Sequence, residues 1–366
     1  MPNQNLHTDR VARLSSLLPN CGHENAAAMI TSPVNIRYFT GFATDTGYLL
    51  LTPRAAYFLT DKRYDEAARG AITSAEVVGF SSLADSLLEI LGGEAIQHLL
   101  IETDVVTLAQ FERLKELLSP VTIVGDAALC KEIKRMRESK SAAEIEAIRH
   151  AQEITELSFS HILGEIREGV SERELSLELE FFMRRNGAEK VAFDLIVASG
   201  ENGSMPHAVP SERRIKSGDF ITFDIGAVYG GYHSDMTRTV AFGSITSEQR
   251  AVYETVREAQ ARAMEYLFAG GRTASLCDKA AREYIEQHGY GKNFTHSTGH
   301  GVGLEIHENP TVSYLSKGEI VSGSVITVEP GIYIEGQFGV RTENMLYVSD
   351  SEVFSFTSIG SELIIL

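Results

Sequence analysis

Residues 219–241 place the narrowest limits on how this chain can fold. Two strand-like runs flank Gly230 and Gly231, which is the pattern of a β-hairpin. Asp224 interrupts the first, apolar run, Asp235 lies on the second, and the turn is nearly midway between them. We therefore expect the two carboxylates to be close cross-strand neighbours, with Cβ atoms about 4.5–5.5 Å apart. Such a pair is destabilising unless a cation lies between the carboxylates or the side chains turn to solvent.

A glycine-rich segment further along contains three histidines within twelve residues. They are His296, His300 and His307, and Gly299 and Gly301 flank the central one. Glycine allows a ligand to approach closely, and neutral imidazole is a common metal ligand, so His300 is the best candidate of the three. The segment is neither an HExxH zinc motif nor a phosphate-binding loop. The alternative interpretation is a polar loop that carries three surface histidines.

Two glutamates are the remaining candidates. Glu329 closes an apolar strand and precedes a Pro-Gly turn, and Glu343 shares one face of a strand with Arg341 through period-two alternation. Each pattern alone also fits a solvated strand end or an exposed ion pair. The four segments together offer two Asp, one central His and two Glu. This oxygen-rich set suits Mn²⁺, Co²⁺ or Zn²⁺, and the harder end of the series favours Mn²⁺. A pair of such ions would support hydrolysis of an amide or ester.

The charge balance excludes some functions. The chain has 366 residues, with 33 Lys and Arg against 50 Asp and Glu, a formal net charge of −17. A nucleic-acid binder needs basic surface, so nucleic acid is not an expected partner. The sequence contains no recognisable secretory signal and no apolar run of membrane-spanning length, so we expect a cytoplasmic protein without a membrane partner. Cys21, Cys130 and Cys277 are far apart and odd in number, which indicates reduced thiols.

A change of composition marks the expected domain boundary. Residues 131–140 carry five basic residues, and Ser141 and Glu144 follow with the spacing of a capping box. We expect domains over residues 1–131 and 132–366. In the first, residues 28–60 indicate strands with turns, and alternation of helices with strands then predicts an α/β layer domain. The expected helices cover 82–91 and 107–118, and the expected strands cover 98–102 and 121–124.

The second domain has an α+β pattern, with helices packed on a largely antiparallel sheet. The expected helices cover about 142–166, 171–186, 247–268 and 273–288. Strands are expected at about 191–199 and 220–242 and through most of the remaining sequence.

The motifs FDIG, HSD, GHGVG, VEPG and RTEN occur here in the order and local context of the pita-bread metallopeptidases. This family includes methionine aminopeptidase, prolidase and aminopeptidase P. The resemblance implies an α+β catalytic domain of the pita-bread fold with two divalent metal ions. It implies that Asp224 chelates one ion, that Asp235 and Glu343 bridge both, and that His300 and Glu329 complete the other site. Glu329 would also be the general base that acts on a hydroxide bridging the metals.

The segment Met205-Pro206-His207 resembles the proline-specific branch of the family. That resemblance implies that His207 and His307 hydrogen-bond the scissile carbonyl and its oxyanion. His296 would line the pocket for proline, and Tyr333 and Arg341 would contact the substrate.

Two N-terminal segments resemble a creatinase-like N-terminal α/β domain, which methionine aminopeptidases normally lack. They are NIRYFTG at 35–41 and TDKRY at 60–64. The resemblance therefore favours a prolidase or an aminopeptidase P that removes an N-terminal residue from a dipeptide or peptide with proline in second position. A homodimer is implied as well. One departure is Asn344, because many relatives have Asp after the glutamate ligand.

Two other functions stay open at this point. One is metal-independent hydrolysis of the creatinase type, and the other is a catalytically inactive pita-bread protein that acts as a binding or chaperone module. Retention of all five ligand positions argues against both. The sequence does not decide between dipeptidase and aminopeptidase P, nor does it identify the native metal.

Overall fold

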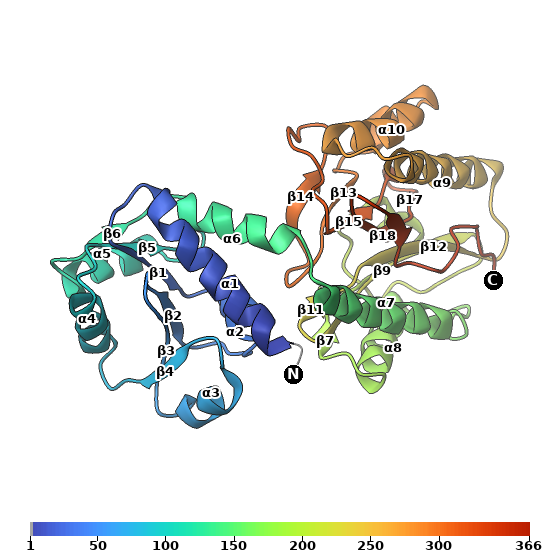
Figure 1. Cartoon of the computed structure of the whole chain (residues 1–366). Coiled ribbons are helices and arrows are strands. Elements are labelled where there is room, and N and C mark those ends of the chain that lie inside the picture. Colours follow the sequence, from blue (N-terminus) through green and yellow to red (C-terminus); the bar gives the residue numbers. More distant parts are fainter. Residues whose placement is uncertain (1–2) are drawn as a thin grey trace. The chain divides into compact units, whose positions relative to one another are not determined.

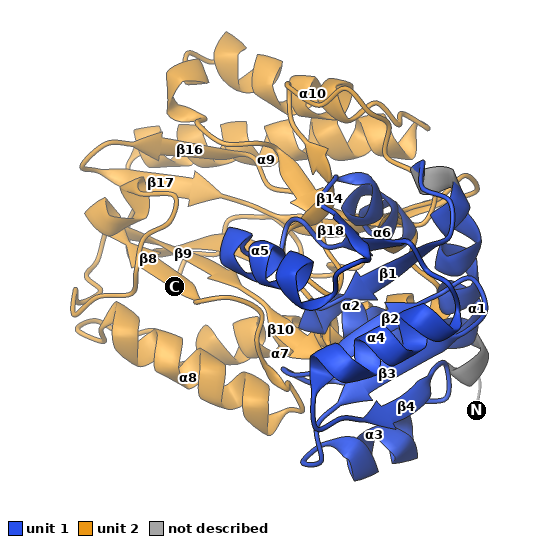
Figure 2. Ribbon diagram, turned by 90° about the vertical axis from the view of Figure 1, so that its left-hand side faces the viewer, with its two compact units in different colours: residues 1–136 blue, residues 137–366 orange. Residues whose placement is uncertain are grey.

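The computed structural model describes residues 3–366, and it describes side chains from residue 6 onward except at 20 and 21. The chain divides into two compact units, residues 1–136 and 137–366 (Figure 1, Figure 2). Helix α6 (Ala128–Glu138) contains this division, and it also contains the position where the sequence indicates the domain boundary.

Unit 1 has a six-stranded mixed sheet with the strand order β4-β3-β2-β1-β5-β6. Strand β1 pairs antiparallel with β2 and parallel with β5. The helices pack around this sheet as the expected α/β layers. The strands are β1 (Ala26–Ile30), β2 (Tyr48–Leu51), β3 (Ala56–Thr60), β4 (Glu76–Gly79), β5 (His98–Ile101) and β6 (Thr122–Val124), and the helices include α1 (Asn3–Leu17), α3 (Asp65–Ala71), α4 (Leu83–Gly93) and α5 (Leu108–Leu117).

One expectation for this unit is wrong, because residues 28–60 are not only strands and turns. Helix α2 (Pro33–Thr40) lies between β1 and β2. The Ser32 side chain accepts a hydrogen bond from the Asn35 backbone, and Pro33 occupies the first turn, where its missing N–H costs nothing. Gly41 ends the helix with φ 72°, a left-handed conformation that suits glycine. These end signals outweigh the β-branched and aromatic residues inside the segment.

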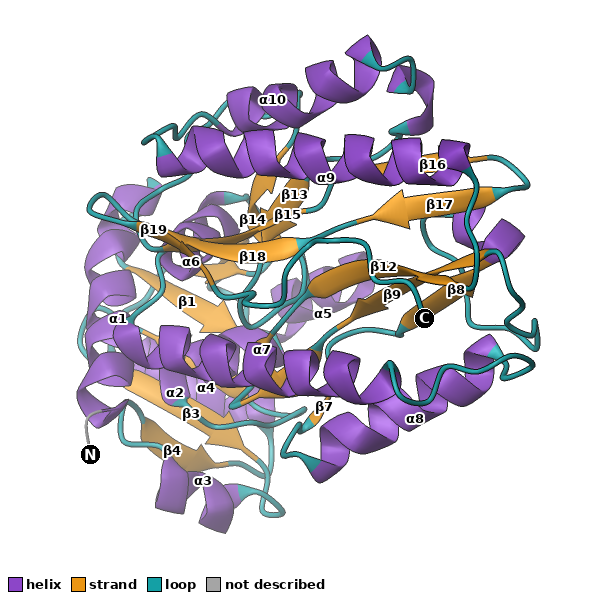
Figure 3. Ribbon diagram, turned by 90° about the vertical axis from the view of Figure 1, so that its right-hand side faces the viewer, coloured by secondary structure: helices purple, strands orange, loops and turns teal. Residues whose placement is uncertain are grey.

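Unit 2 has small antiparallel sheets between two pairs of helices. Helices α7 (Ala142–Ile162) and α8 (Glu172–Arg185) lie on one side of the strands, and α9 (Ser247–Phe268) and α10 (Ala274–Gln287) lie on the other (Figure 1, Figure 3). The sheet orders are β12-β9-β8, β11-β10-β7, β14-β13-β15-β18-β19 and β16-β17. This confirms the expected α+β class.

The strands of unit 2 are short, and several of them end inside the protein. Their bounds are β7 (Lys190–Val191), β8 (Ile196–Ser199), β9 (Asp219–Ile225), β10 (Ala227–Tyr229), β11 (Tyr232–His233), β12 (Met236–Phe242), β13 (Gly299–Gly301), β14 (Glu308–Val312), β15 (Ser324–Val328), β16 (Gly331–Ile334), β17 (Phe338–Arg341), β18 (Asn344–Val348) and β19 (Val353–Ser355).

Each helix pair of unit 2 has its own core against the strands. The core beneath α9 and α10 includes Val252, Tyr253, Cys277, Ile326 and Val340. The core beneath α7 and α8 includes Ile154, Leu175, Leu179, Val197 and Phe223. Helices α7, α8 and α9 each begin with a capping box, as expected for α7 from Ser141 and Glu144. Local end signals and apolar faces therefore agree on where these helices lie.

Two expectations from composition can be compared with the described residues. Cys130 and Cys277 are buried and form no disulfide, whereas the side chain of Cys21 lies outside the described part. Within residues 3–366, no helix combines the length and the hydrophobicity needed to cross a membrane.

A buried arginine joins the centre of unit 2 to its C-terminal segment. Arg238 on β12 is 2% exposed, and this burial lowers its pKa. Its guanidinium donates five hydrogen bonds, to the carbonyl oxygens of Thr237, Glu343, Ile359 and Gly360 and to Asn344 Oδ1. Asn344, the departure from the family pattern, therefore has a defined partner.

We expect Arg238→Leu to lower the free energy of unfolding by about 3 kcal/mol or more, because five buried acceptors lose their donor. Urea denaturation followed by circular dichroism measures the effect. The control is Arg250→Leu, an exposed site near the start of α9, which should change stability by less than about 0.5 kcal/mol. Equal unfolding midpoints for Arg238→Leu and the wild type would contradict the prediction.

Candidate metal centre

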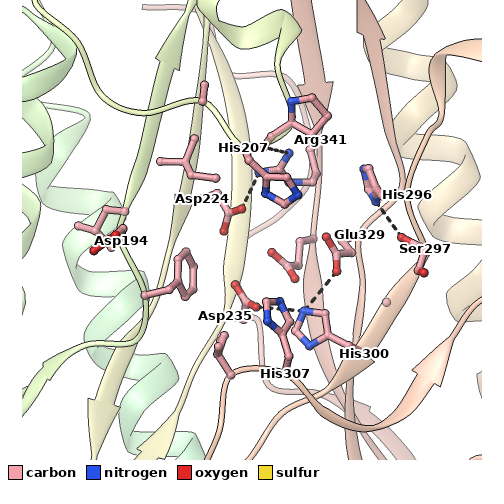
Figure 4. Close-up of a pocket in the computed structure, with 18 of the residues that line it drawn as sticks. Asp194, His207, Asp224, Asp235, His296, Ser297, His300, His307, Glu329 and Arg341 are labelled. Atoms are coloured by element: carbon pink, nitrogen blue, oxygen red, sulfur yellow. Dashed lines mark hydrogen bonds and ion pairs between the residues drawn. The ribbon is translucent and has the colours of Figure 1, made fainter.

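A cavity of about 720 Å³ in unit 2 collects nearly all the candidate site residues (Figure 4). Nine of the ten residues singled out from the sequence line it: His207, Asp224, Asp235, His296, His300, His307, Glu329, Arg341 and Glu343. The tenth, Tyr333, lies behind this surface, and its hydroxyl contacts His296 and Arg341. Residues separated by more than a hundred positions therefore meet in one place.

Four of the five candidate ligands stand at strand ends or between strands. Asp224 is near the end of β9, and Asp235 directly precedes β12. His300 is the central residue of β13, Glu329 directly follows β15, and Glu343 lies between β17 and β18. Strand ends free the side chains from strict alternation, so residues from separate sheets can face one point.

The hairpin that carries the two aspartates forms, but its register differs from the expectation. Strands β9 and β12 pair with Asp224 opposite Thr237, so the turn is centred between Gly230 and Gly231. Asp235 is therefore two residues before Thr237, the residue that lies opposite Asp224. The carboxylates are therefore diagonal neighbours on one face, for which separations of about 7–8 Å, and somewhat less between Cβ atoms, are usual. Direct opposition would need a turn centred one residue earlier.

The glycines beside His300 serve the sheet rather than a ligand. A Cβ at Gly299 would lie 2.0 Å from Thr327 O, and one at Gly301 would lie 2.1 Å from Asn309 O. Only glycine therefore permits the close approach of the strands on both sides of β13. The two glycines allow His300 to be held deep between β14 and β15.

Hydrogen bonds fix the orientation of the His300 ring. His300 Nδ1 lies 3.1 Å from Gly301 O, which places a proton on Nδ1 and turns Nε2 toward the acidic residues. Nε2 lies 3.3 Å from Glu329 Oε1 and 3.5 Å from Asp235 Oδ2. Thr327 joins the group, since its hydroxyl accepts from the His300 backbone at 3.0 Å and donates to Glu329 Oε1 at 3.2 Å.

Three carboxylate oxygens in this cavity have no hydrogen-bond partner in the described part of the chain. They are Asp224 Oδ1, Asp235 Oδ1 and Glu343 Oε1, and all three are buried. Asp235, His300 and Glu343 each also offer a ligand atom within 4.8 Å of the others. Unpaired buried carboxylate oxygens are costly unless a cation neutralises them. Oxygen ligands with one imidazole are the set that divalent first-row metals bind, so these residues fit a metal.

The pKa values reflect the crowding of negative charge. Burial, followed by the nearby Glu343 and Asp224, raises the pKa of Asp235 well above its usual value. Burial, followed by Glu329 and Asp224, raises the pKa of Glu343 to about 8. Burial also opposes ionisation of Glu329, but the hydrogen bond and charge of His300 lower its pKa to about 2. One imidazole therefore balances only part of the negative charge.

Arg341 is buried at 4% exposure and faces Asp224 rather than Glu343. Its Nη2 donates to Asp224 Oδ2 at 2.5 Å, and its Nη1 donates to Tyr333 Oη at 2.6 Å. The expected continuous strand is interrupted at 342–343, and Glu343 is buried at 1% exposure. These observations exclude the alternative of an exposed Arg341–Glu343 ion pair.

The other histidines lie around the acidic cluster. His207 and His307 are exposed to the cavity, and the ring of His307 packs edge-on against His300 with centroids 4.4 Å apart. His296 is part-buried, and its Nε2 lies 2.9 Å from Tyr333 Oη. Burial lowers the pKa of both His296 and His307, which favours neutral rings.

Supporting residues that the sequence did not single out complete the site. Thr237 donates to Glu343 Oε2 at 2.7 Å, and it lies two residues after Asp235, so strand alternation could have identified it. Asp278 is fully buried and accepts from Thr298 Oγ1 at 2.9 Å. Its helical neighbour Arg282, four residues on, donates to His296 O at 2.8 Å. In the sequence, only the i,i+4 spacing of Asp278 and Arg282 could have indicated this ion pair.

Comparison with known proteins agrees with this geometry. The model for metallopeptidase family M24 matches residues 146–350, and that for the creatinase/prolidase N-terminal domain matches residues 10–139. The chain belongs to metallopeptidase family M24. Membership confirms the resemblance seen in the sequence, together with the pita-bread fold and the creatinase-like N-terminal domain. It also means that divalent metal ions belong to the active enzyme.

Relatives in this M24 family match nearly the whole chain. The chain is 38% identical over 340 residues to the Xaa-Pro dipeptidase of Pyrococcus furiosus, which covers 92% of this chain and 94% of that protein. The structure of the Xaa-Pro dipeptidase from Bacillus anthracis has a TM-score of 0.93 at 38% identity, covering 98% and 100%. An X-Pro aminopeptidase structure from Thermotoga maritima has a TM-score of 0.88 at 34% identity, covering 97% and 100%.

We expect Mn²⁺ to raise the midpoint of thermal unfolding of EDTA-treated protein, because the unpaired oxygens gain a partner. At a hundredfold excess over Kd the gain is about 2.7 kcal/mol. Asp235→Asn should remove most of this gain. It should not lower the stability of the metal-free protein, because burial and the neighbouring carboxylates already oppose ionisation of Asp235. Differential scanning calorimetry with and without Mn²⁺ measures both effects.

The matched control for this prediction is Asp194→Asn. Asp194 lines the same cavity and is exposed, and Figure 4 shows it apart from the labelled histidines and acids. This variant should keep the full gain from Mn²⁺. A wild-type protein that gains nothing, or an Asp235→Asn variant that gains as much as the wild type, would contradict the assignment.

Proposed function

We propose that this M24 enzyme hydrolyses the bond between an N-terminal residue and a proline in second position, using two divalent metal ions. The observation that carries the proposal is the group of unpaired buried oxygens on Asp224, Asp235 and Glu343 beside His300. The near-full coverage of Xaa-Pro dipeptidases from Pyrococcus furiosus and Bacillus anthracis supports the same substrate class.

Five side chains would hold the two metals: Asp224, Asp235, His300, Glu329 and Glu343. Asp224, Asp235 and Glu343 would each offer the metals a buried carboxylate oxygen that has no hydrogen-bond partner in the described residues. Four carboxylates match the charge of two divalent cations, and their hard oxygen atoms favour Mn²⁺. When bound, the ions supply a Lewis acid and a water of lowered pKa that attacks near neutral pH.

The chain's own residues would then orient the peptide and move the proton. Glu329 would accept the proton of the attacking water and return it to the departing proline nitrogen, since Thr327 holds its Oε1. His207 and His307 are exposed on the cavity wall and would donate to the scissile carbonyl oxygen as negative charge develops there.

The remaining contacts would recognise the proline side of the substrate. Proline has no N–H, so a site for it needs no acceptor at that position. His296 would lie beside the ring, with its own orientation set by Tyr333 at 2.9 Å. The buried guanidinium of Arg341 donates to both Tyr333 and Asp224. It therefore joins a proposed substrate contact to a proposed metal ligand.

The alternatives find less support in this arrangement. Both creatinase-type hydrolysis and an inactive binding module would leave the buried carboxylate cluster without a purpose. The homodimer, the cytoplasmic location and Mn²⁺ as native metal stay predictions.

We expect Glu329→Gln to lower kcat on Ala-Pro by about 10²–10⁴-fold, because the variant cannot accept the water's proton. The assay uses Mn²⁺-loaded enzyme, with circular dichroism to confirm the fold. Glu335→Gln is the matched control, since Glu335 is exposed near the turn between β16 and β17. Wild-type turnover by Glu329→Gln would refute the assignment of Glu329 as the general base. Wild-type turnover by His300→Ala would refute the assignment of His300 as a metal ligand.

The substrate class is tested with Ala-Pro, Ala-Pro-Ala and Ala-Ala. We expect cleavage before proline, with Ala-Ala at least about a hundredfold slower if His296 and its neighbours recognise the proline ring as proposed. EDTA should abolish turnover and Mn²⁺ or Co²⁺ should restore it. The ratio of Ala-Pro to Ala-Pro-Ala turnover separates a dipeptidase from an aminopeptidase P.

Two results would overturn the proposal. Turnover that survives EDTA would favour metal-independent chemistry of the creatinase type. Intact Xaa-Pro peptides after incubation with the Mn²⁺-loaded enzyme would favour the binding module.

A further inference from the structure

Glu172 is a fully buried carboxylate to which the mechanism above assigns no role. It is the first residue of α8 and has 0% exposure. Its two oxygens accept five hydrogen bonds of 2.6–3.0 Å, from Ser199 N and Oγ, from Asn202 Nδ2 and from Ser211 N and Oγ. Hydrogen bonds to an ionised acceptor are among the strongest in proteins. A carboxylate with this many partners fixes the positions of the residues that donate to it.

All five donors belong to one segment, residues 199–211. Ser199 ends β8, Asn202 lies in the short helix η2 (Gly200–Ser204), and Ser211 lies at the far end of the segment. Glu172 Oε1 binds the first end, whereas Oε2 binds Asn202 and the second end. The carboxylate therefore closes the base of a loop, and His207 is carried by that loop.

Further contacts extend this clamp through the loop. Asn202 Nδ2 also lies 3.4 Å from Val209 O, across the loop from its bond to Glu172. Arg341 Nη1 donates to Pro206 O at 3.3 Å, next to His207. The loop is thus tied at its base by Glu172 and near its tip by a residue of the metal cavity.

The base of the loop is also joined to the strand that carries a candidate ligand. Arg213 Nη1 donates to Ser199 Oγ at 2.7 Å and to Asp219 Oδ2 at 2.7 Å. Asp219 begins β9, the strand that carries Asp224. Ser199 is therefore held between Glu172 and Arg213. Through Asp219, Arg213 also fixes the base of the loop relative to β9.

Helix α8 does not depend on Glu172 for its own start. Its capping box is made by Ser171 and Glu174, which bond to each other. The negative charge of Glu172 is favourable at this helix end, but its hydrogen-bonding capacity is directed to the loop. Removal of the charge should therefore release the loop before it unfolds the helix.

We propose that Glu172 is a positioning residue that sets the place of His207 over the metal cavity. His207 is exposed to the cavity, so the backbone that carries it, rather than side-chain packing, determines where its imidazole lies. The proposal rests on the proposed function in one respect, the contact of His207 with the scissile carbonyl. A displacement of about 1 Å in such a group can reduce turnover by about a hundredfold.

A double-mutant cycle with Glu172→Gln and His207→Ala tests the proposal. The amide of the introduced glutamine has only one acceptor oxygen. Its NH₂ group therefore faces the donors at one end of the loop, and the hydrogen bonds at that end are lost. We expect Glu172→Gln to lower kcat/KM on Ala-Pro by about tenfold or more, mainly through kcat. In the H207A background the same substitution should change kcat/KM by less than about twofold, because the group that it positions is gone. Equal losses in both backgrounds would overturn the proposal and indicate a general structural role.

Glu174→Gln is the matched control, because it makes the same Glu-to-Gln change in the same helical turn, where Gln also fits a capping box, without contacting residues 199–211. Glu174→Gln should show no dependence on His207. If Glu172→Gln does not fold, Ser211→Ala removes a single hydroxyl from the clamp and should show the same dependence with a smaller loss. A Ser211→Ala variant with wild-type kcat/KM would count against the proposal.

Hydrogen–deuterium exchange provides a readout that does not require activity. In Mn²⁺-loaded Glu172→Gln we expect faster exchange in residues 199–211 and unchanged exchange in α8. Wild-type exchange in that segment would overturn the clamp. Loss of kcat/KM in His207→Ala but not in Glu172→Gln would overturn the positioning proposal alone. A His207→Ala variant with wild-type kcat/KM would instead overturn the role of His207 in the proposed function.

Discussion

Mutual repulsion of buried carboxylates is the constraint on which the rest of unit 2 depends. Asp224, Asp235, Glu329 and Glu343 share one cavity, where His300 Nε2 lies 3.3 Å from Glu329 and 3.5 Å from Asp235, and three of their oxygens have no partner in the described residues. A flexible arrangement would let these groups separate and turn to solvent. The fold prevents this by attaching each acid to a strand end or a strand break. The resulting charge excess is what makes the site suitable for cations.

Buried polar groups surround this cluster and orient it. Arg341 holds Asp224, Thr237 holds Glu343, and Thr327 holds Glu329. Further out, Arg238 and Glu172 bind backbone groups of the segments that bear the site. Each of these residues is nearly saturated with hydrogen bonds, and a saturated buried network has one preferred geometry. The stability of unit 2 and the geometry of the candidate site therefore depend on many of the same contacts.

Much of the fold could be predicted where local signals agree. The sequence located α7, α8 and α9, with a capping box recognised only for α7, because a helix is specified by residues three and four apart. Helix α2 was missed because its evidence lay in its ends, at Ser32, Pro33 and Gly41, while its interior resembled a strand. The hairpin was expected, but its register was displaced, since a Gly-Gly pair identifies a turn without fixing its centre.

The sequence by itself determined which residue types could bind metal and in what order they occur, and its motifs indicated the M24 family. These properties are local, because each motif is a short run of neighbouring residues. Only the tertiary structure decided how the segments meet. It paired Arg341 with Asp224, broke the strand before Glu343, and brought Glu172 against both ends of the His207 loop. Those contacts join residues between 27 and 117 positions apart. No local periodicity records such separations.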